Sequence, residues 1–240
     1  MTDLDLFAWG GGWGDELARG LLVTLEIAVA GYLLGLLLGL AAAYGELSRR
    51  RWLRWLVQGW GLVFRSVPEL LIIFLFYYGG ALALRWLLAP LGAGRIDVGP
   101  YAAGIAALAL IQAAYACQVF RGALLAVPRG ALDAARSLGL KDWQVALTVT
   151  LPLALRYAFA GLVNLWLNAL KTTPLLSAIG LQDFIRAADT AGQNTKRYFA
   201  FFLVILAVYL AVSALTLWIQ RRYGDRLFRH LGPLAGTRAR

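Results

Sequence analysis

Long apolar runs separated by short basic segments constrain this chain more than any other feature of its sequence. Several runs contain about 18 residues or more, the length that a helix needs to cross the ~30 Å hydrocarbon core of a bilayer. Hydrophobic residues make up 60% of the 240 positions, and the mean hydropathy is +0.67, which excludes an ordinary soluble domain. Because lipid offers the backbone no hydrogen bonds, we predict an all-α membrane protein with a single transmembrane domain over residues 1–240.

Five transmembrane helices follow from the lengths of the apolar runs. The expected spans are residues 21–44, 55–88, 101–120, 157–173 and 198–220. The second span is too long for one straight crossing, and Pro68 in its middle predicts a kink, because proline removes a backbone donor. The fourth span should break at Thr172-Thr173-Pro174. The short apolar segment after it, residues 175–181, is typical of a broken helix or a re-entrant piece.

The first span has small residues along one face. Gly31, Gly35 and Gly39 recur every four residues, which leaves a groove that favours close packing of another helix in lipid. Glu26 lies near the outer end of the same span, where its side chain can reach the interface. We interpret Glu26 as structural.

Basic residues set the predicted orientation. The net charge of +10 could indicate a nucleic-acid partner, but the basic residues flank the apolar runs. With the N-terminus outside, the cytoplasmic segments hold fifteen of the 23 Lys and Arg residues, and the outer segments hold six. The positive-inside rule therefore predicts an N-out, C-in topology with residues 121–156 in the cytoplasm, a lipid bilayer as partner and no nucleic acid. No basic region precedes the first span, so we expect no cleavable signal peptide.

No residue pattern predicts catalysis or metal binding. None of the three lysines lies in a Gly-rich phosphate loop, and His230 is the only histidine. No Ser or Cys therefore has a histidine within the membrane body that could activate it as a nucleophile. We expect a chain that is not an enzyme, binds no metal or cofactor, and takes its energy from a partner.

Ionisable residues within the predicted spans mark a candidate site, because charged groups in a membrane are costly. Glu69 lies about 21 Å into the second span, and Lys171 lies at a similar depth in the fourth, at ~1.5 Å per residue. Arg65 can pair with Glu69 at i, i+4 spacing. The sequence predicts either a central substrate site, with a carboxylate for a cationic group, or structural pairs of Glu69 with Arg65 or Lys171.

A polar stripe on the fourth span extends this candidate site. Asn164, Asn168 and Lys171 recur at i, i+4, i+7 and so share one helix face. Such a stripe must face protein or water, so the asparagines either line a translocation path or bond to a neighbouring helix. Two polar residues of the third span complete the set. The candidate substrate-binding residues are Arg65, Glu69, Tyr115, Gln118, Asn164, Asn168, Lys171 and Thr172.

Residues 122–156 are polar enough to interrupt the apolar pattern and predict a helix–turn–helix on the inner face of the membrane. The pair Ala134-Ala135 leaves a nearly bare helix face that a groove of another protein could cover. Gly139 can adopt a positive φ and end this helix. Asp142 can cap the next helix, and Pro152 is tolerable only near a helix start or a kink. We predict a docking element.

This segment closely resembles the cytoplasmic loop of ABC-importer permeases that carries the coupling helix. Asp133-Ala134-Ala135 is followed by Gly139, Val149 and Leu151-Pro152 at the spacing of that family, with Asp133 where Glu is usual. The resemblance implies that residues 121–156 are the coupling loop. It assigns the ATPase contact to Asp133, Ala134, Ala135, Arg136, Leu138, Gly139 and Leu140.

The resemblance extends from residue 20 to about residue 222 and is to permeases for polar amino acids. The stretch Arg65-Ser66-Val67-Pro68-Glu69 resembles the second span of the histidine, lysine/arginine/ornithine and opine type, where an acidic residue follows the proline. The end of the third span, residues 115–122, also matches, except that Gln118 replaces a common Glu. Residues 170–176 resemble the Leu-Lys-x-Thr-Ser-Leu stretch of the family, with Pro174 in the Ser position.

The resemblance implies a type I ABC importer permease fold with five spans in the bacterial inner membrane. The implied partners are a second permease subunit, identical or paralogous, two ATPase subunits that bind ATP and Mg²⁺, and an external substrate-binding protein. The implied function is uptake of a polar, cationic amino acid, such as histidine, arginine, lysine or ornithine, or of an opine. The alternatives are a self-sufficient ion-coupled transporter or channel, which the lack of a long internal repeat disfavours, and a membrane scaffold that transports nothing.

Overall fold

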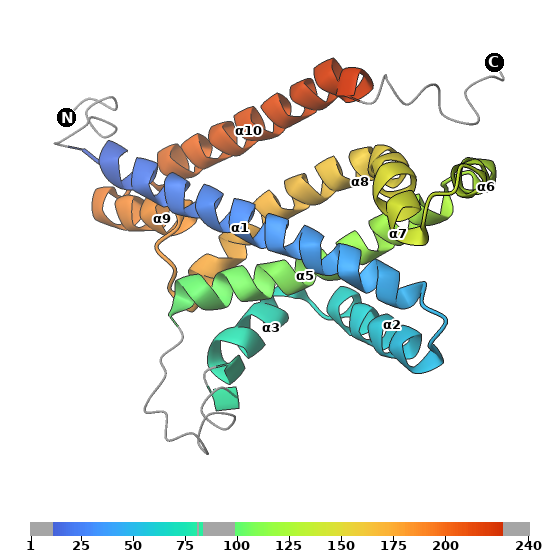
Figure 1. The fold of residues 1–240 in the computed structure, drawn as a ribbon. Helices are drawn as coiled ribbons and strands as arrows, with labels where there is room; N and C mark the ends of the chain where they lie inside the picture. The colour runs from blue at the N-terminus through green and yellow to red at the C-terminus, as the bar shows by residue number, and fades with distance from the viewer. Residues whose placement is uncertain (1–11, 81, 84–98, 228–240) are drawn as a thin grey trace.

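The computed structural model describes residues 12–80, 82–83 and 99–227, and these residues form helices joined by short turns without a strand (Figure 1). The all-α prediction is confirmed. The end of the expected second span (residues 84–88) and His230 lie outside the described residues. The α-helices are α1 Gly14–Glu46, α2 Arg51–Ser66, α3 Glu69–Phe74, α5 Pro100–Leu125, α6 Arg129–Ser137, α7 Asp142–Val145, α8 Leu151–Thr172, α9 Phe184–Thr195 and α10 Tyr198–Leu227. Two π-helical turns, η2 Leu75–Gly79 and η4 Ala146–Thr150, and a 3₁₀ helix, η5 Thr173–Ile179, extend them.

Four helical stretches in the described part of the chain are long and apolar enough to cross a membrane. They are α1, α5, α10 and the continuous stretch Asp142–Ile179. A fifth span results if α2 and the following helix, Glu69–Gly79, are taken as one broken span, because they are bent by 109°. The bend is at Pro68, as predicted. Val67 before it is extended, with ψ 137°, because a proline ring disfavours helical backbone in the preceding residue.

Helices α1 and α5 run in parallel and pack closely along the glycine face of α1. A Cβ atom added at any of the three glycines would lie 2.5–2.7 Å from a side-chain atom of α5, so no side chain fits there. The contact advances four residues at a time on both helices. The pairs are Gly31 with Leu108, Gly35 with Gln112, and Gly39 with Ala116. The predicted close packing of this face is confirmed.

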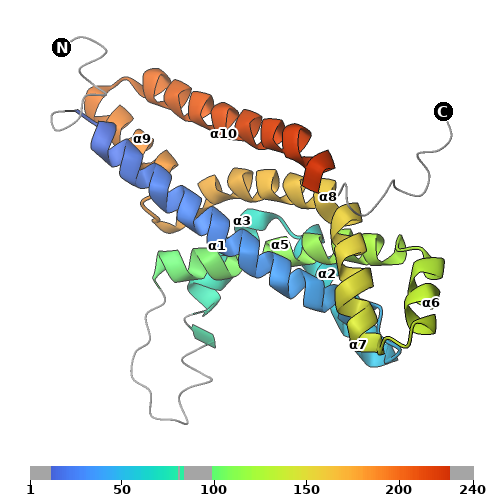
Figure 2. The ribbon, with the colours of Figure 1, turned by 45° about the horizontal axis from the view of Figure 1, so that its top comes forward.

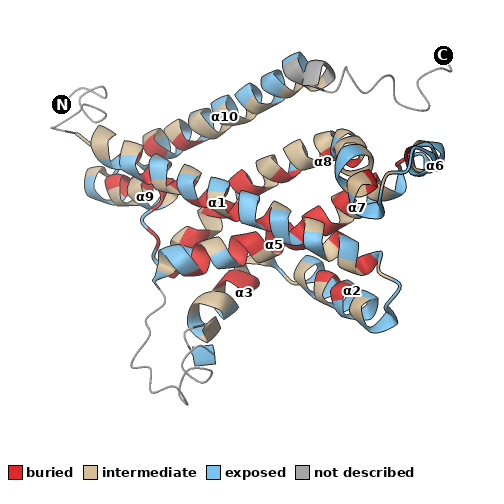
Figure 3. Cartoon of the chain, viewed as in Figure 1, coloured by how far each residue is buried: buried red, intermediate tan, exposed pale blue. Residues whose placement is uncertain are grey.

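Buried side chains gather where α1, α5 and α8 meet, whereas α10 is covered on one side only (Figure 3). Phe201 of α10 is fully buried against α9, but Phe199 is 82% exposed. An apolar exposed face of this kind suits a helix that borders lipid. Its other exposed large apolar residues are Phe202, Leu203, Leu206, Leu210, Leu215, Leu217, Trp218 and Ile219.

The stretch from α7 to η5 is one continuous path with two local distortions. The π-helical turn η4 comes directly before α8, whose second residue is Pro152, and so accommodates a residue that has no backbone N–H. At the other end the helix tightens into η5, which contains Pro174. Leu176 of η5 is fully buried in a cluster with residues of α1, α3 and α5. The expected break at Thr172-Thr173-Pro174 is therefore not found, because the segment after Thr172 is a tightened continuation of α8.

Helix α9 was not predicted. Asp183 caps it by accepting a hydrogen bond from the Arg186 N–H at 2.9 Å, and Phe184, Ala188 and Ala191 form its buried face. An acidic cap followed by apolar residues at i, i+4 and i+7 is a signal that could have revealed the helix.

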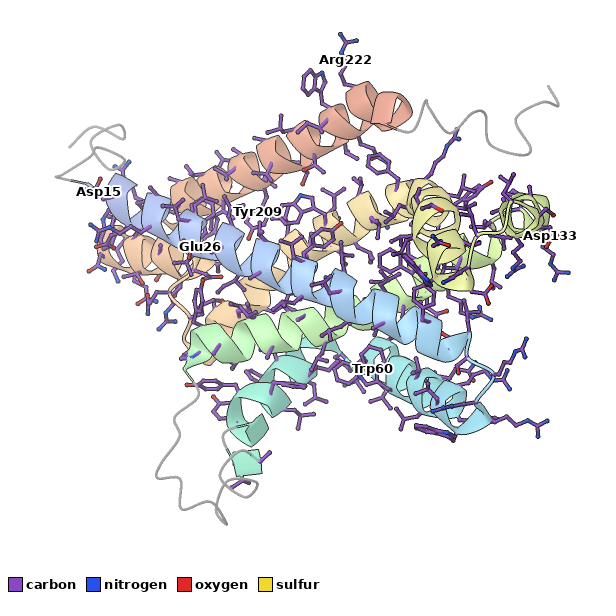
Figure 4. All side chains as sticks on the ribbon, in the orientation of Figure 1. Asp15, Glu26, Trp60, Asp133, Tyr209 and Arg222 are labelled. Atoms are coloured by element: carbon purple, nitrogen blue, oxygen red, sulfur yellow. The ribbon has the colours of Figure 1, made fainter. Side chains whose placement is uncertain are left out.

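The elements place two different surfaces at opposite ends of the bundle. Figures 1 and 2 both show α9 beside the start of α1, and α6 and α7 at the far end. Figure 4 shows Asp15 and Glu26 toward the first end and Asp133 at the second. A helix of 33 residues such as α1 is about 50 Å long, enough to separate these surfaces by the thickness of a bilayer.

Candidate functional site

A polar cavity opens between α5 and α8. Its volume is about 230 Å³, and it is lined by Tyr115 of α5 and by Asn164, Leu165, Asn168 and Lys171 of α8. The i, i+4, i+7 spacing on α8 therefore does bring these polar side chains to one space. Amides, a phenol and an ammonium group can together donate to a carboxylate and accept from an amino group.

Glu69 stands beside this cavity and is linked to α8 through Thr172. The Thr172 hydroxyl lies 2.8 Å from Glu69 Oε2 and 3.0 Å from the Asn168 carbonyl oxygen. A hydroxyl has a single proton, so Thr172 donates to one of these acceptors at a time. Glu69 is partly exposed, whereas Thr172 is buried. The carboxylate is thus held by one neutral donor and remains able to accept from a further cation.

The predicted Arg65–Glu69 pair is not formed, and neither is Glu69–Lys171, within the described part of the chain. The Arg65 Nε–H instead donates to the Gly61 carbonyl oxygen at 2.8 Å. The break at Pro68 explains the difference, because an i, i+4 pair needs a continuous helix and the axis turns by 109° between the two residues. Lys171 lines the cavity with its side chain exposed.

Gln118 lies apart from the cavity, in a polar cluster at the end of α1. Its Nε2 donates to Glu46 Oε2 at 3.2 Å. Glu46 is the last residue of α1, and its side chain is only 6% exposed. Sequence reasoning missed Glu46, although an acidic residue that closes a long apolar span is a visible signal. Glu26, in the first half of α1, accepts from the Tyr101 hydroxyl of α5 at 3.2 Å.

The turn after α6 has the geometry that its glycine predicts. Gly139 has a φ of +79°, a left-handed conformation in which residues with a Cβ are strained. Its N–H donates to the Arg136 carbonyl oxygen at 2.9 Å, and the Leu140 N–H donates to that of Ala135 at 3.4 Å. These two bonds close a Schellman-type turn, which ends α6 and directs the chain into α7.

The solvent-exposed face of α6 is charged, and an exposed leucine follows it. Asp133 and Arg136 are paired at 3.5 Å on this face, with side chains 72% and 54% exposed. Leu138 is 82% exposed, an unusual cost in water for a side chain of that size. Ala135 is buried instead, so the bare face predicted for both alanines consists of Ala134 alone.

The expected cap of α7 by Asp142 is wrong. Asp142 is the first residue of α7, and its carboxylate lies 3.5 Å from Arg136 Nε. The N-cap position is occupied by Lys141, whose N–H donates to Gln144 Oε1 at 2.9 Å. The acceptor is the side chain of Gln144, the third residue of α7. The preference of single residues for the cap position does not reveal such a contact.

Among the residues that the structure describes, no group of three or more His, Cys, Asp or Glu side chains could hold a metal ion. Cys117 is buried, and its thiol lies 3.4 Å from Glu46 Oε2.

Comparison with known sequences places this architecture among transport proteins. Residues 35–229 match the family described as the binding-protein-dependent transport system inner membrane component. The chain is 37% identical over 216 residues to the histidine/lysine/arginine/ornithine transport system permease protein HisQ of Escherichia coli, covering 88% of this chain and 95% of the relative. It is 39% identical over 217 residues to the nopaline transport system permease protein NocQ of Agrobacterium fabrum, covering 89% and 92%.

Solved structures show the same fold. A crystal structure of an amino acid ABC transporter with histidines superposes with a TM-score of 0.75 at 27% identity, over 89% of this chain and 95% of that one. An inward-facing structure of the MetNI methionine ABC transporter gives a TM-score of 0.70 at 19% identity, over 97% and 100%. The second likeness concerns the fold alone. The chain belongs to the family of binding-protein-dependent transport system inner membrane components and is a multi-pass permease subunit of the bacterial inner membrane.

Proposed function

We propose that this chain, as a single transmembrane domain, forms half of the translocation path of an ATP-driven importer for cationic amino acids or opines. The cavity between α5 and α8 supports this most directly. At about 230 Å³ it is smaller than the ~300–1,000 Å³ of sites for drug-sized ligands, and it suits a small polar molecule. A polar cavity within a membrane bundle points to function by default.

The substrate class follows from the charges around the cavity. An amino acid presents a carboxylate, which the Lys171 ammonium can attract, with Asn164 and Asn168 as hydrogen-bonding neighbours. Glu69 supplies an acceptor for a positively charged side chain, beside Thr172. The names of HisQ and NocQ describe transport of histidine, lysine, arginine and ornithine and of nopaline, and these compounds combine a carboxylate with nitrogen-containing cationic groups.

Energy would come from two ATPase subunits that bind ATP and Mg²⁺. They would contact the solvent-exposed face of α6 and the turn between α6 and α7. The exposed Leu138 beside the Asp133–Arg136 pair is an apolar anchor within a charged rim, the arrangement of a protein–protein contact. A second permease subunit would complete the path. A substrate-binding protein outside the membrane would deliver the substrate.

Uptake into proteoliposomes tests this function. The complex of permease pair, ATPases and binding protein is reconstituted with ATP at the ATPase side, and labelled arginine uptake is measured for wild type and Asn168→Ala. We expect ATP-dependent uptake, with KM raised about tenfold by Asn168→Ala, because a site polar group loses its partner. Asn194→Ala is the matched control, since Asn194 lies on the exposed side of α9 and donates to the Thr190 carbonyl oxygen.

The same assay separates the substrate class from the transport mechanism. Glu69→Gln should abolish the preference for arginine over an uncharged amino acid of similar length while the complex still assembles. An unchanged preference would contradict the role of Glu69. Uptake by this chain alone, driven by an ion gradient without ATP, would instead indicate the self-sufficient transporter.

A further inference from the structure

The C-terminal part of α5 is linked to the end of α1 and to the middle of α2 by a buried carboxylate. Glu46 Oε1 lies 3.1 Å from Arg121 Nε and 3.4 Å from Gln58 Nε2. Its Oε2 lies 3.2 Å from Gln118 Nε2 and 3.4 Å from Cys117 Sγ. Four side chains from two other helices therefore surround one side chain of α1, three through hydrogen bonds and Arg121 through an ion pair. We call this set, Glu46 with Gln58, Cys117, Gln118 and Arg121, the Glu46 anchor.

Stability does not explain why a carboxylate occupies this position. Glu46 is the last residue of α1, where the helix dipole is negative and disfavours an acidic side chain. Its side chain is 6% exposed, and desolvation of an ion pair often offsets its Coulomb attraction. The Arg121 Nε–H does not point along the 3.1 Å contact, so the pair is ionic rather than a directed hydrogen bond. The net stability that such a pair adds is therefore small.

The anchor lies at the point where a force on α6 would enter the membrane domain. Arg121 lies one turn before the end of α5 at Leu125, and α6 begins at Arg129. Val127 in the short connection is buried, so the connection is packed rather than loose. Toward the outer side, α1 and α5 are already in contact along the glycine face. The anchor continues this contact to the cytoplasmic end.

We propose that Glu46 is a positioning residue that makes α1 and α5 move as one body when the ATPases displace α6. The proposal rests on the proposed function. It adds that the negative charge of the Glu46 anchor must be carried by α1 and not by α5. Without the anchor, displacement of α6 would be absorbed by separation of the ends of α5 and α1. ATP would then be hydrolysed without a matching movement of the translocation path.

Three variants separate this role from a general need for charge balance. Glu46→Gln removes the charge but keeps the shape. The exchange Glu46→Gln with Gln118→Glu keeps one carboxylate in the cluster but moves it onto α5, the helix that also carries Arg121. Glu26→Gln is the matched control, because Glu26 also lies on α1 and accepts from α5, through Tyr101 in the first turn of α5.

The first measurement is the ratio of substrate imported to ATP hydrolysed in the reconstituted complex. Glu46→Gln should lower this ratio about tenfold, within the range of coupling effects of single residues, while Glu26→Gln leaves it unchanged. The exchange variant should assemble as well as wild type but remain as poorly coupled as Glu46→Gln. Wild-type coupling in the exchange variant would overturn the proposal, because charge balance alone would then suffice.

The second measurement does not depend on transport. Cys117 is the only cysteine of the chain and is 2% exposed between the two helices, so its alkylation in the assembled complex reports their separation. The rate should rise at least several-fold in both Glu46→Gln and the exchange variant, which retains a carboxylate near the thiol, and stay at the wild-type value in Glu26→Gln. Equal rates in all four proteins would overturn the anchor, whereas failure of ATP-driven uptake in wild type would overturn the proposed function.

Discussion

At the scale of single residues, Asp183 is a buried carboxyl group outside the spans that is only partly satisfied by hydrogen bonds. Its side chain is fully buried, Oδ1 accepts from the Arg186 N–H, and Oδ2 has no hydrogen-bond partner among the described residues. Burial raises the pKa of this carboxyl from 3.8 to about 6, although the backbone hydrogen bond and the Arg186 charge act to lower it. The folded protein therefore holds this proton more tightly than the unfolded chain does.

The pH dependence of stability tests this environment. Because the pKa is higher in the folded state, the stability contributed by protonated Asp183 is complete below pH 4 and is lost as pH rises through about 6. Asp183→Asn keeps a capping oxygen without the charge. It should match wild type near pH 4 and exceed it at pH 8 by up to about 3 kcal/mol. Thermal unfolding in detergent at both pH values, with Asp189→Asn on the same helix as control, measures this. The same difference in stability between wild type and Asp183→Asn at pH 4 and at pH 8 would contradict this prediction.

The residues of the candidate site were predictable from spacing, but their contacts were not. Asn164, Asn168 and Lys171 share a cavity because helical periodicity fixes which face they occupy. The partner of Glu69 depends on how α3 leaves the break at Pro68, and that direction is a tertiary property. Gln118 illustrates the same limit, because its acceptor, Glu46, is 72 positions away in the sequence.

At the scale of elements, the turn between α6 and α7 is the part whose geometry is most tightly fixed by one residue. Gly139 and Gly130 both have open space around an added Cβ, but only Gly139 has a positive φ. An alanine at 139 must adopt a left-handed conformation at a cost of about 1–2 kcal/mol, whereas an alanine at 130, the second residue of α6, keeps the ordinary helical backbone.

Paired alanine substitutions therefore isolate the backbone conformation of this turn. Gly139→Ala should weaken ATPase binding and reduce ATP-driven uptake, and Gly130→Ala should not reduce ATPase binding. Co-purification of the ATPase with each permease variant, followed by uptake in proteoliposomes, measures both effects. Equal behaviour of the two variants would show that the left-handed turn does not matter for coupling.

Helices were predictable where a long apolar run marks them, and less so where they are short, as with α9, whose cap signal was missed. The glycine face of α1 and the break at Pro68 follow from local backbone chemistry. Helix α9 is short and amphipathic, and its buried face is covered by α10, with Phe201 fully buried. The direction in which α10 returns over α9 cannot be read from the sequence of either helix.

At the scale of the whole molecule, the proposed translocation path and the proposed ATPase contact occupy different parts of the chain. Figure 4 places Asp133 of the contact far from Asp15 and Glu26 at the opposite end. The glycine face and the Glu46 anchor join α1 and α5 between these ends. A displacement of α6 can therefore reach the cavity through helices that are already packed together.

The most direct test of this account is cross-linking from α6 to the ATPase. In a Cys117→Ala background, a cysteine at position 138 or at position 199 is labelled with a photoreactive maleimide in the assembled complex. Leu138 and Phe199 are both 82% exposed, but only Leu138 belongs to the proposed contact. We predict that Leu138→Cys gives a covalent adduct with the ATPase and that Phe199→Cys gives none; an adduct from Phe199→Cys alone, or from neither position, would contradict the account.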